Sequence, residues 1–400
     1  MVVQAAVMWC VGLEFQYLCL GKCASSRYSE FPIAGGGGKK APETLRATGS
    51  SAGDPCLKSR CMGMLLEKER VDFMQAEQDT HLPESFIFPR LIGFGECDAA
   101  RIYKTPRAVD CAVEALDAWF EAVLGVSWAD LLRLHDLDLS FTRIASEYLR
   151  PITAGQLVTI RVNVVGIDQT AITFRATGEI DAGQPCFRVT LVACFAERTS
   201  PAAIPVPARF RDRIEQYRAT HAAEVLTPRS ELHTPRSAAT QGQTGTGQLP
   251  LQLDRGGAAF VRQHRVVYGE CGMSGRVYAP RVYDYALEAV GEWYHRTLGI
   301  SWLQQCILLK GQPFVDINCS YLGDMEPGCM LDIVVQVSRL GAASIVYSVT
   351  GYDDRGLPCF DVRMAACYID ESSGVYKPTP FPEEYRRRIL AYQATCQAAG

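Results

Sequence analysis

The segment GECDAARIYKTPR, which starts at Gly95, recurs as GECGMSGRVYAPR starting at Gly269. The same offset aligns LGVSW in the first half with LGISW in the second, so the likeness extends well beyond one motif. A sequence repeated at a constant offset indicates a folding unit that the chain contains twice. The position of Asp98 in the first copy is occupied by Gly272 in the second. This pattern predicts a duplicated symmetric dimer in which one of two equivalent sites has been lost.

The rest of the chain divides around these two copies. Its 400 residues are enough for two or three domains, and each copy is long enough to organise one core. Residues 1–78 share nothing with the repeats and include the low-complexity run AGGGGKKAPETLRATGSSAGD, so we expect a disordered or dispensable leader. We assign residues 79–220 to the first repeat, 221–259 to a flexible linker and 260–400 to the second repeat.

The apolar start of the leader is open to a second interpretation, as a signal or membrane segment. It lacks a basic flank and carries Glu14 inside the apolar run, which argues against that interpretation. A true start near Met62 or Met64 would make the leader dispensable.

Composition and charge narrow the classes of partner. The net charge is −4 and the basic residues are scattered, so the sequence shows no footprint for nucleic acid or for an anionic membrane. The 16 cysteines lack CxxC pairs and nearby histidines at zinc-ligand spacing, so no metal site is expected. Several recur in apolar runs such as VACF and AACY, which is typical of free core cysteines in a reducing compartment. We therefore predict a cytoplasmic protein without a metal or other cofactor.

Each copy follows the order strand, long helix, four strands and closing helix. In the first copy we predict that Thr105 caps the helix, that Pro106 is its first helical residue, and that its apolar stripe ends at Gly125. Four β-rich runs joined by short turns favour antiparallel neighbours, because parallel strands need crossover segments. The order predicts an α+β fold of the hotdog type, in which an antiparallel sheet wraps around a long central helix. Two such sheets paired edge to edge as a pseudo-dimer would form a double hotdog.

The first copy of the repeated segment resembles the signature G-D-C-D-P-A-G-I-V-Y-x-P-R of the 4-hydroxybenzoyl-CoA thioesterase family of hotdog acyl-CoA thioesterases. The resemblance extends over both repeats but not over the leader or the linker. It implies that Asp98 is the catalytic carboxylate, as nucleophile or as general base toward water, and that the backbone N–H of Thr105 donates to the oxyanion. Thioester hydrolysis needs groups of these two kinds, and a helix N-terminus favours negative charge. The sequence departs from the signature at Glu96, Ala99 and Arg101, the last replacing a glycine that permits unusual backbone geometry.

Alternative roles remain for the residues around this segment. Asp98 has an alternative interpretation as a cap of the turn before the helix. Glu96 is a second candidate base, but a glutamate at the end of a strand is more often solvated or paired with an arginine such as Arg107 or Arg281. Cys97 is a candidate nucleophile, although no histidine is near it in sequence and a structural role is expected.

Four further acids lie at helical spacing on the two central helices, and we expect them to pair across the repeat interface. They are Asp110, Glu114, Asp284 and Glu288.

The predicted substrate is an acyl thioester carried on CoA or on an acyl carrier protein, whose phosphates would favour surface arginines. A tunnel between the two helices would hold the acyl group, with aromatic residues as its candidate lining: Trp119, Phe120, Trp293 and Tyr294, with Trp128 and Trp302. Two other functions stay open, a non-catalytic acyl-thioester binding or scaffold protein and a hotdog dehydratase using His135 or His295. Beyond the pseudo-dimer within one chain, a higher homo-oligomer is left open.

Overall fold

The computed structural model describes residues 86–181, 183–198, 202–221, 259–307, 310–370 and 377–398. The predicted leader and nearly all of the predicted linker lie outside these residues, so the domain boundaries given above stay predictions. Within the described part, no helix has the length and apolar character needed to cross a membrane.

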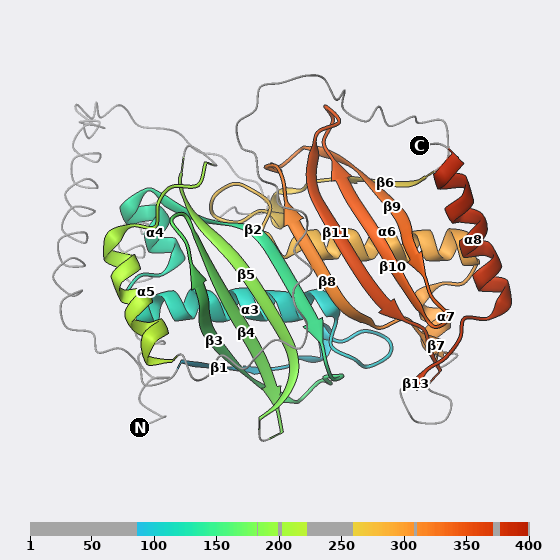
Figure 1. The fold of residues 1–400 in the computed structure, drawn as a ribbon, viewed down its shortest axis with the longest axis horizontal. Helices are drawn as coiled ribbons and strands as arrows, with labels where there is room; N and C mark the ends of the chain where they lie inside the picture. Colours follow the sequence, from blue (N-terminus) through green and yellow to red (C-terminus); the bar gives the residue numbers. More distant parts are fainter. Residues whose placement is uncertain are drawn as a thin grey trace, which may run out of the picture. The chain divides into compact units, whose positions relative to one another are not determined.

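The first repeat contains the predicted order of elements (Figure 1). Strand β1 and the turn η1 precede the central helix α3, whose end continues as the π-helical turn η2; α4, four strands and the closing helix α5 follow. The bounds are β1 Ile87–Leu91, η1 Phe94–Glu96, α3 Thr105–Trp119, η2 Phe120–Leu124, α4 Trp128–His135, β2 Leu137–Tyr148, β3 Leu157–Ile167, β4 Ala171–Ile180, β5 Gln184–Glu197 and α5 Ala208–Thr220.

The second repeat has the same order, with three additional short strands. Its bounds are β6 Phe260–Arg265, η4 Tyr268–Glu270, α6 Arg281–Leu298, α7 Trp302–Ile307, β7 Lys310–Gly311, β8 Phe314–Tyr321, β9 Met330–Leu340, β10 Ser344–Tyr352, β11 Pro358–Cys367, β12 Ile369–Asp370, β13 Lys377–Pro378 and α8 Glu383–Ala398.

Ten strands from the two repeats form one antiparallel sheet, in the order β1-β3-β4-β5-β2-β8-β11-β10-β9-β6. The short strands β13, β12 and β7 form a separate sheet. The second half of this order mirrors the first, and the join lies between β2 and β8, where Ala145 pairs with Asn318 (Figure 1). The two sheets predicted for the pseudo-dimer are therefore continuous. Pairing edge to edge at β2 and β8 satisfies backbone groups that a separate repeat would leave open.

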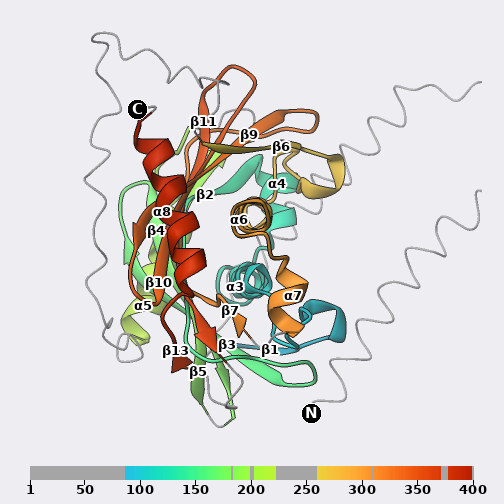
Figure 2. The same ribbon diagram turned by 90° about the vertical axis from the view of Figure 1, so that its right-hand side faces the viewer.

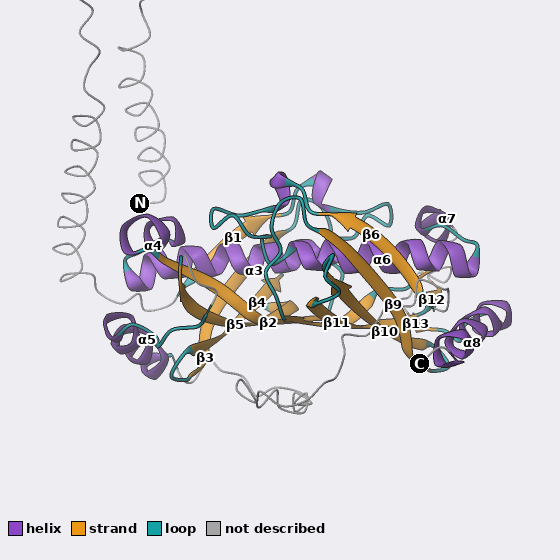
Figure 3. Ribbon diagram, turned by 90° about the horizontal axis from the view of Figure 1, so that it is seen from above, coloured by secondary structure: helices purple, strands orange, loops and turns teal. Residues whose placement is uncertain are grey.

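Both central helices lie on the same face of this sheet, as the end-on view shows (Figure 2), and the view from above shows α3 and α6 along that face (Figure 3). Alternate residues of β4 are buried, as expected of a strand with one covered face. The apolar stripe of α3 is buried, and its central residues Val109, Ala112 and Leu116 are 0% exposed. Burial of this stripe against the sheet is the main stabilising contribution to each repeat.

The ends of α3 differ slightly from the prediction. The helix begins at Thr105 itself, with Lys104 as the N-cap residue and no capping side chain, so Thr105 is the first helical residue and Pro106 the second. Proline suits either of these positions, because neither N–H has a partner within the helix. The helical run ends as predicted at Gly125, which has a left-handed backbone with φ 74°.

Candidate functional site

The residues before α3 fold into a small hairpin with Asp98 at its tip. The N–H of Lys104 donates to Glu96 O at 2.9 Å, and the N–H of Asp98 donates to Ile102 O at 2.9 Å. Between these two bonds, the backbones of Cys97 and Tyr103 form an antiparallel β-bridge. Asp98 is thus at the tip of the hairpin, and the returning strand of the hairpin leads directly into Thr105 at the start of α3. A joint catalytic role of Asp98 and Thr105 stays a prediction.

The Asp98 side chain holds the turn at the hairpin tip. Its Oδ1 accepts hydrogen bonds from the N–H groups of Ala100 at 2.9 Å and Ile102 at 3.2 Å. This is the capping role considered for Asp98 from the sequence. The other carboxylate oxygen, Oδ2, has no hydrogen-bond partner in the part of the chain that the structure describes. One oxygen therefore fixes the carboxylate in place while the second is available.

The equivalent loop of the second repeat keeps this geometry without an acid. The N–H of Gly272 donates to Arg276 O at 2.9 Å, and the N–H of Gly275 donates to Gly272 O at 3.0 Å. The hairpin closes in the same way, from Tyr278 N to Glu270 O at 2.9 Å. An aspartate at the tip is therefore not needed for the loop to form.

A third turn of the same kind shows what a purely structural aspartate looks like. Asp353 lies between β10 and β11, and its Oδ1 accepts from the N–H groups of Arg355 at 3.0 Å and Leu357 at 2.8 Å. Its Oδ2 accepts from the Arg355 side chain at 2.7 and 2.9 Å. Burial alone would raise the pKa of Asp353, but the hydrogen bonds from Leu357 and Arg355 hold it below its usual value. The available Oδ2 distinguishes Asp98 from this structural aspartate.

The start of α3 is fixed by a tyrosine that the sequence analysis missed. The Tyr148 hydroxyl at the end of β2 donates to Thr105 O at 3.1 Å, and Tyr321 at the end of β8 donates to Ala279 O at 2.8 Å. The signal was present in the sequence, because both tyrosines end corresponding predicted strands. These bonds use the carbonyl of Thr105 and leave its N–H at the positive end of the helix dipole.

Glu96 and Glu270 both close the turn in front of the site loop. Glu96 accepts from Gly93 N–H at 2.7 Å and from the Arg90 side chain at 2.7 Å. Glu270 accepts from Val267 N–H at 2.9 Å and lies 3.2 Å from the His264 ring. Glu96 is thus paired with an arginine, as the sequence suggested, but the arginine is Arg90 of β1 and not Arg107 or Arg281. Glu270 is paired with His264 of β6. Engagement of both Glu96 oxygens favours a structural role over a catalytic one.

Cys97 has the environment of an unreactive thiol. Burial raises its pKa, as it does for the equivalent Cys271. A thiol with a raised pKa has little of the thiolate needed for attack at neutral pH. The structural role expected for Cys97 agrees with this environment.

A cluster of four charges joins the first turns of α3 and α6. Arg107 donates to both carboxylate oxygens of Asp284, at 3.1 and 2.9 Å, and Arg281 donates to the same carboxylate at 2.8 Å. Arg107 also forms an ion pair with Asp110. The N-terminus of α3, and with it the site loop, therefore lies at the seam between the repeats.

The four helix acids divide into two kinds. Pairing across the interface is confirmed for Asp284. It is wrong for Asp110, whose ion pair is with Arg107 of its own helix. It is also wrong for Glu114 and Glu288, which form ion pairs with Arg90 of β1 and Arg262 of β6 in their own repeats. They lie one turn farther along each helix, where the neighbouring element is the edge strand.

Four of the predicted acyl-lining aromatics lie inside the repeats, whereas Trp128 is half-buried and Trp302 is 39% exposed. Trp119 is 0% exposed and packs edge-on against Phe174 of β4 and Tyr217 of α5. Trp293 is likewise 0% exposed and packs against Tyr347 and Tyr392. Phe120 and Tyr294 are buried beside them. This packing supports a core role, and an acyl tunnel lined by them stays a prediction.

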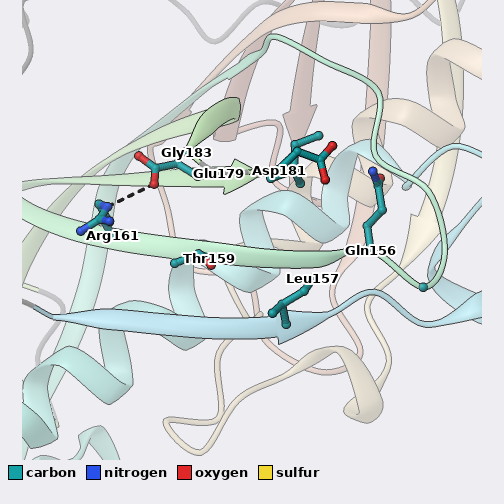
Figure 4. Close-up of a pocket in the computed structure, with 9 residues that line it drawn as sticks. Gln156, Leu157, Thr159, Arg161, Glu179, Asp181 and Gly183 are labelled. Carbon is teal, nitrogen blue, oxygen red and sulfur yellow. Dashed lines mark hydrogen bonds and ion pairs between the residues drawn. The ribbon is translucent and has the colours of Figure 1, made fainter.

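Two of the hollows on the described surface can be placed relative to the site, and Asp98 lines neither of them. The larger, of about 700 Å³, lies over β3, β4 and the turn after β4. Figure 4 shows its lining, which includes Gln156, Leu157, Thr159 and the Arg161–Glu179 ion pair. These β3 side chains point away from α3, because their buried alternates Val158 and Ile160 face the core. The smaller, of about 310 Å³, lies at the seam beside Arg107, Asp284 and Tyr285. The larger hollow is thus on the wrong face of the sheet to serve the Asp98 loop.

Of the two histidines that an alternative dehydratase would need, His295 is far from the start of its helix. It lies in the last turn of α6, about 20 Å along the axis from the N-terminus. His135 is the last residue of α4. Nor do the described residues contain a group of three or more His, Cys, Asp or Glu side chains that could hold a metal ion.

Comparison with known proteins assigns this double hotdog to a family. Residues 92–214 match the model of the thioesterase-like superfamily and residues 275–360 match that of the thioesterase superfamily. The chain belongs to the thioesterase superfamily, with two hotdog domains in tandem, and is by that membership a thioester hydrolase. The resemblance to 4-hydroxybenzoyl-CoA thioesterases is confirmed at this level.

Solved structures with the same fold span most of the chain. A provisionally named oleoyl thioesterase from Lactobacillus plantarum is 13% identical, with a TM-score of 0.53, and the match covers 70% of this chain and 95% of that one. A 12:0-ACP thioesterase from Umbellularia californica is 12% identical, with a TM-score of 0.53 and coverage of 72% and 95%. No curated protein matches the sequence significantly. At these identities the structural likeness establishes the fold alone.

Proposed function

We propose that the chain hydrolyses acyl thioesters of CoA or of an acyl carrier protein at a single site built on Asp98. The observation that carries the proposal is the Asp98 carboxylate itself, one oxygen of which is fixed by two backbone N–H groups while the other has no partner among the described residues. A fixed carboxylate with an available oxygen is suited to attack or to proton removal. The names of the two solved relatives, an oleoyl thioesterase and a 12:0-ACP thioesterase, support an acyl thioester as the substrate, and the second supports an acyl carrier protein as one carrier.

The reaction breaks the carbonyl carbon–sulfur bond and adds one water. Asp98 either attacks the carbonyl carbon, giving an acyl anhydride that water then opens, or removes a proton from the water that attacks. In both routes the thiolate leaves, takes up a proton and departs as the free thiol. The Thr105 N–H, at the start of α3, would stabilise the oxyanion, because unpaired amides and the helix dipole favour negative charge there.

The second repeat acts in this proposal as the structural partner of the first. Its loop has Gly272 in place of the acid, and its cation Arg276 forms ion pairs with Asp138 of the first repeat at 3.1 Å and with Asp324 at 3.4 Å. An ion pair across the seam stabilises the loop without supplying a nucleophile. The ten described cysteines are all free, which supports our placing the enzyme in a reducing compartment such as the cytoplasm.

The first prediction concerns Asp98→Asn. We expect this change to lower kcat for thiol release by at least about 1,000-fold, because an amide can neither attack nor accept the proton. The measurement is release of free thiol from short, long and aromatic acyl-CoAs and from acylated carrier protein, followed with a thiol indicator. Binding of acyl-CoA without thiol release in the parent would favour the binding-protein alternative.

Asp353→Asn is the matched control, because Asp353 holds the same turn with the same pair of backbone donors away from the seam. We expect it to reduce stability but to leave kcat near the parent value. Equal turnover by the parent and Asp98→Asn would overturn the assignment. For an active parent, single turnover in ¹⁸O-water separates the two routes, since only attack by Asp98 leaves label in its carboxylate.

A further inference from the structure

Arg101 has a backbone conformation that the equivalent turns give to glycine. In the turns that begin at Gly272 and Asp353, the fourth residue is Gly275 with φ 81° and Gly356 with φ 77°. In the turn that begins at Asp98 the fourth residue is Arg101, with φ 64°. A left-handed backbone is less favourable for a residue with a β-carbon than for glycine. The loop that carries the acid therefore keeps an arginine where glycine would be more stable.

The Arg101 side chain has no role in the fold that would explain this. It is exposed, and among the described residues its guanidinium has neither a hydrogen-bond nor an ion-pair partner. Lys104, also exposed, makes one bond from Nζ to Gly95 O at 3.1 Å, which leaves its charge open to other ligands. Strain that the fold does not need points to a function for the residue that bears it.

The two repeats differ in charge at this place. The acid-bearing loop presents Arg101 and Lys104, whereas the second repeat has Gly275 and Tyr278 at these positions. The cation that the second loop does have, Arg276, is bound by two aspartates. The loop with the acid thus carries exposed cations at these two positions, and the loop without the acid does not. This difference occurs in a chain whose net charge is −4.

We propose that Arg101, together with Lys104, binds the phosphate groups of the thiol carrier. This inference rests on the proposed function, since it takes Asp98 as the residue at the thioester. CoA and the carrier-protein arm share phosphopantetheine, with the thiol at one end and the phosphate at the other. A phosphate-binding group is therefore needed at the rim of the site and not beside the carbonyl. An exposed arginine three residues from Asp98 meets this need, and guanidinium groups bind phosphate well.

The test is the ratio of kcat/KM for acyl-CoA to kcat/KM for the matching acyl-pantetheine, which lacks phosphate. We expect Arg101→Gly to lower this ratio about three- to tenfold, and Arg101→Gly with Lys104→Ala to lower it further. Folding of Arg101→Gly is safe, because Gly275 has the same backbone conformation in the other repeat. An unchanged ratio in both variants would overturn the proposal.

Gly275→Arg is the control, because it adds the same side chain on the loop without an acid. The ratio should stay at the parent value; an increase equal to the loss in Arg101→Gly would show a general charge effect and contradict the proposal. Acyl-phosphopantetheine separates the two sources: a loss shared with it identifies the phosphate of the arm, and a loss confined to acyl-CoA identifies the nucleotide phosphates. If Asp98→Asn turns over acyl-pantetheine like the parent, the proposed function fails. If only the ratio is insensitive, this inference alone fails.

Discussion

Asp110 and Asp284 occupy equivalent positions on α3 and α6 but have different surroundings. Asp284 accepts hydrogen bonds from Arg107 and Arg281. Asp110 is buried, 7% exposed, and its ion pair with Arg107 is the only one it makes with the described residues. Burial raises the pKa of Asp110 to about 6, with the arginines opposing the shift. A carboxylate whose folded pKa lies above its unfolded value of 3.8 favours folding when protonated and disfavours it when charged.

The sign of this effect gives a prediction for Asp110→Asn. The folded parent binds the extra proton between about pH 4 and pH 6, so its stability falls as the pH rises through this window. Asparagine lacks this titration. We expect the variant to gain on the parent with rising pH, by about 1–3 kcal/mol between pH 4 and pH 8. Urea unfolding of the parent and the variant at pH 4, 6 and 8 measures this difference in the free energy of unfolding. A difference that is independent of pH would contradict the prediction.

Two glycines in the sheet make space for phenylalanine rings in both repeats. Gly178 of β4 pairs with Phe187 of β5, and Gly351 of β10 pairs with Phe360 of β11. A β-carbon on either glycine would lie 2.3 Å from the ring opposite. Because both rings are buried in the core, they have little room to move.

The glycine-to-phenylalanine pairs predict the cost of adding one methyl group. Gly178→Ala and Gly351→Ala should each destabilise the protein by about 1–3 kcal/mol, since the ring must leave its position in a packed core. Gly166→Ala on β3 is the matched control, because its new methyl would meet only Thr173 at an ordinary 3.9 Å. Urea midpoints of the three variants test this. A cost for Gly166→Ala as large as for the other two would mean that strand propensity, not the ring, sets the effect.

The continuous sheet makes the two repeats interdependent. The seam between β2 and β8 is supported by the Arg143 side chain, which donates to Asn318 at 2.9 Å, and by the Tyr283 hydroxyl of α6, which donates to Ile144 O at 3.0 Å. These bonds cross from one repeat to the other beneath the helix starts. We therefore expect the proposed activity to depend on the seam as well as on Asp98.

Ala145→Pro tests that dependence, because Ala145 pairs with Asn318 at the middle of the seam. Proline has no N–H and is not tolerated inside a central strand, so the change should separate the repeats and reduce thiol release by more than about tenfold. Ala145→Ser, which keeps the N–H, should behave like the parent. Thiol release and far-UV circular dichroism of both variants give the answer. Full activity of the proline variant would show that the site does not need the seam.

The order of elements and the strand and helix types could be predicted because they depend on local patterns. The period-2 alternation in β4 and the apolar stripe of α3 each report one covered face. The helix start was placed one residue late, since Thr105 has the composition of a cap but Lys104 takes that position. Cap positions depend on how the preceding hairpin closes, and the hairpin is set by contacts outside the helix.

The sequence by itself determined that the chain holds two hotdog units, that one acid is missing from the second, and that the acid precedes a helix start. The repeat and the residue types are sufficient for these conclusions. Only the tertiary structure decided the partners of each charge, the choice of β2 and β8 as the strands that join the sheet, and the exposure of the Arg101 side chain. Charged side chains are long, and ion pairs with different partners have similar energies. Their pairing therefore follows from packing between distant segments and not from local sequence pattern.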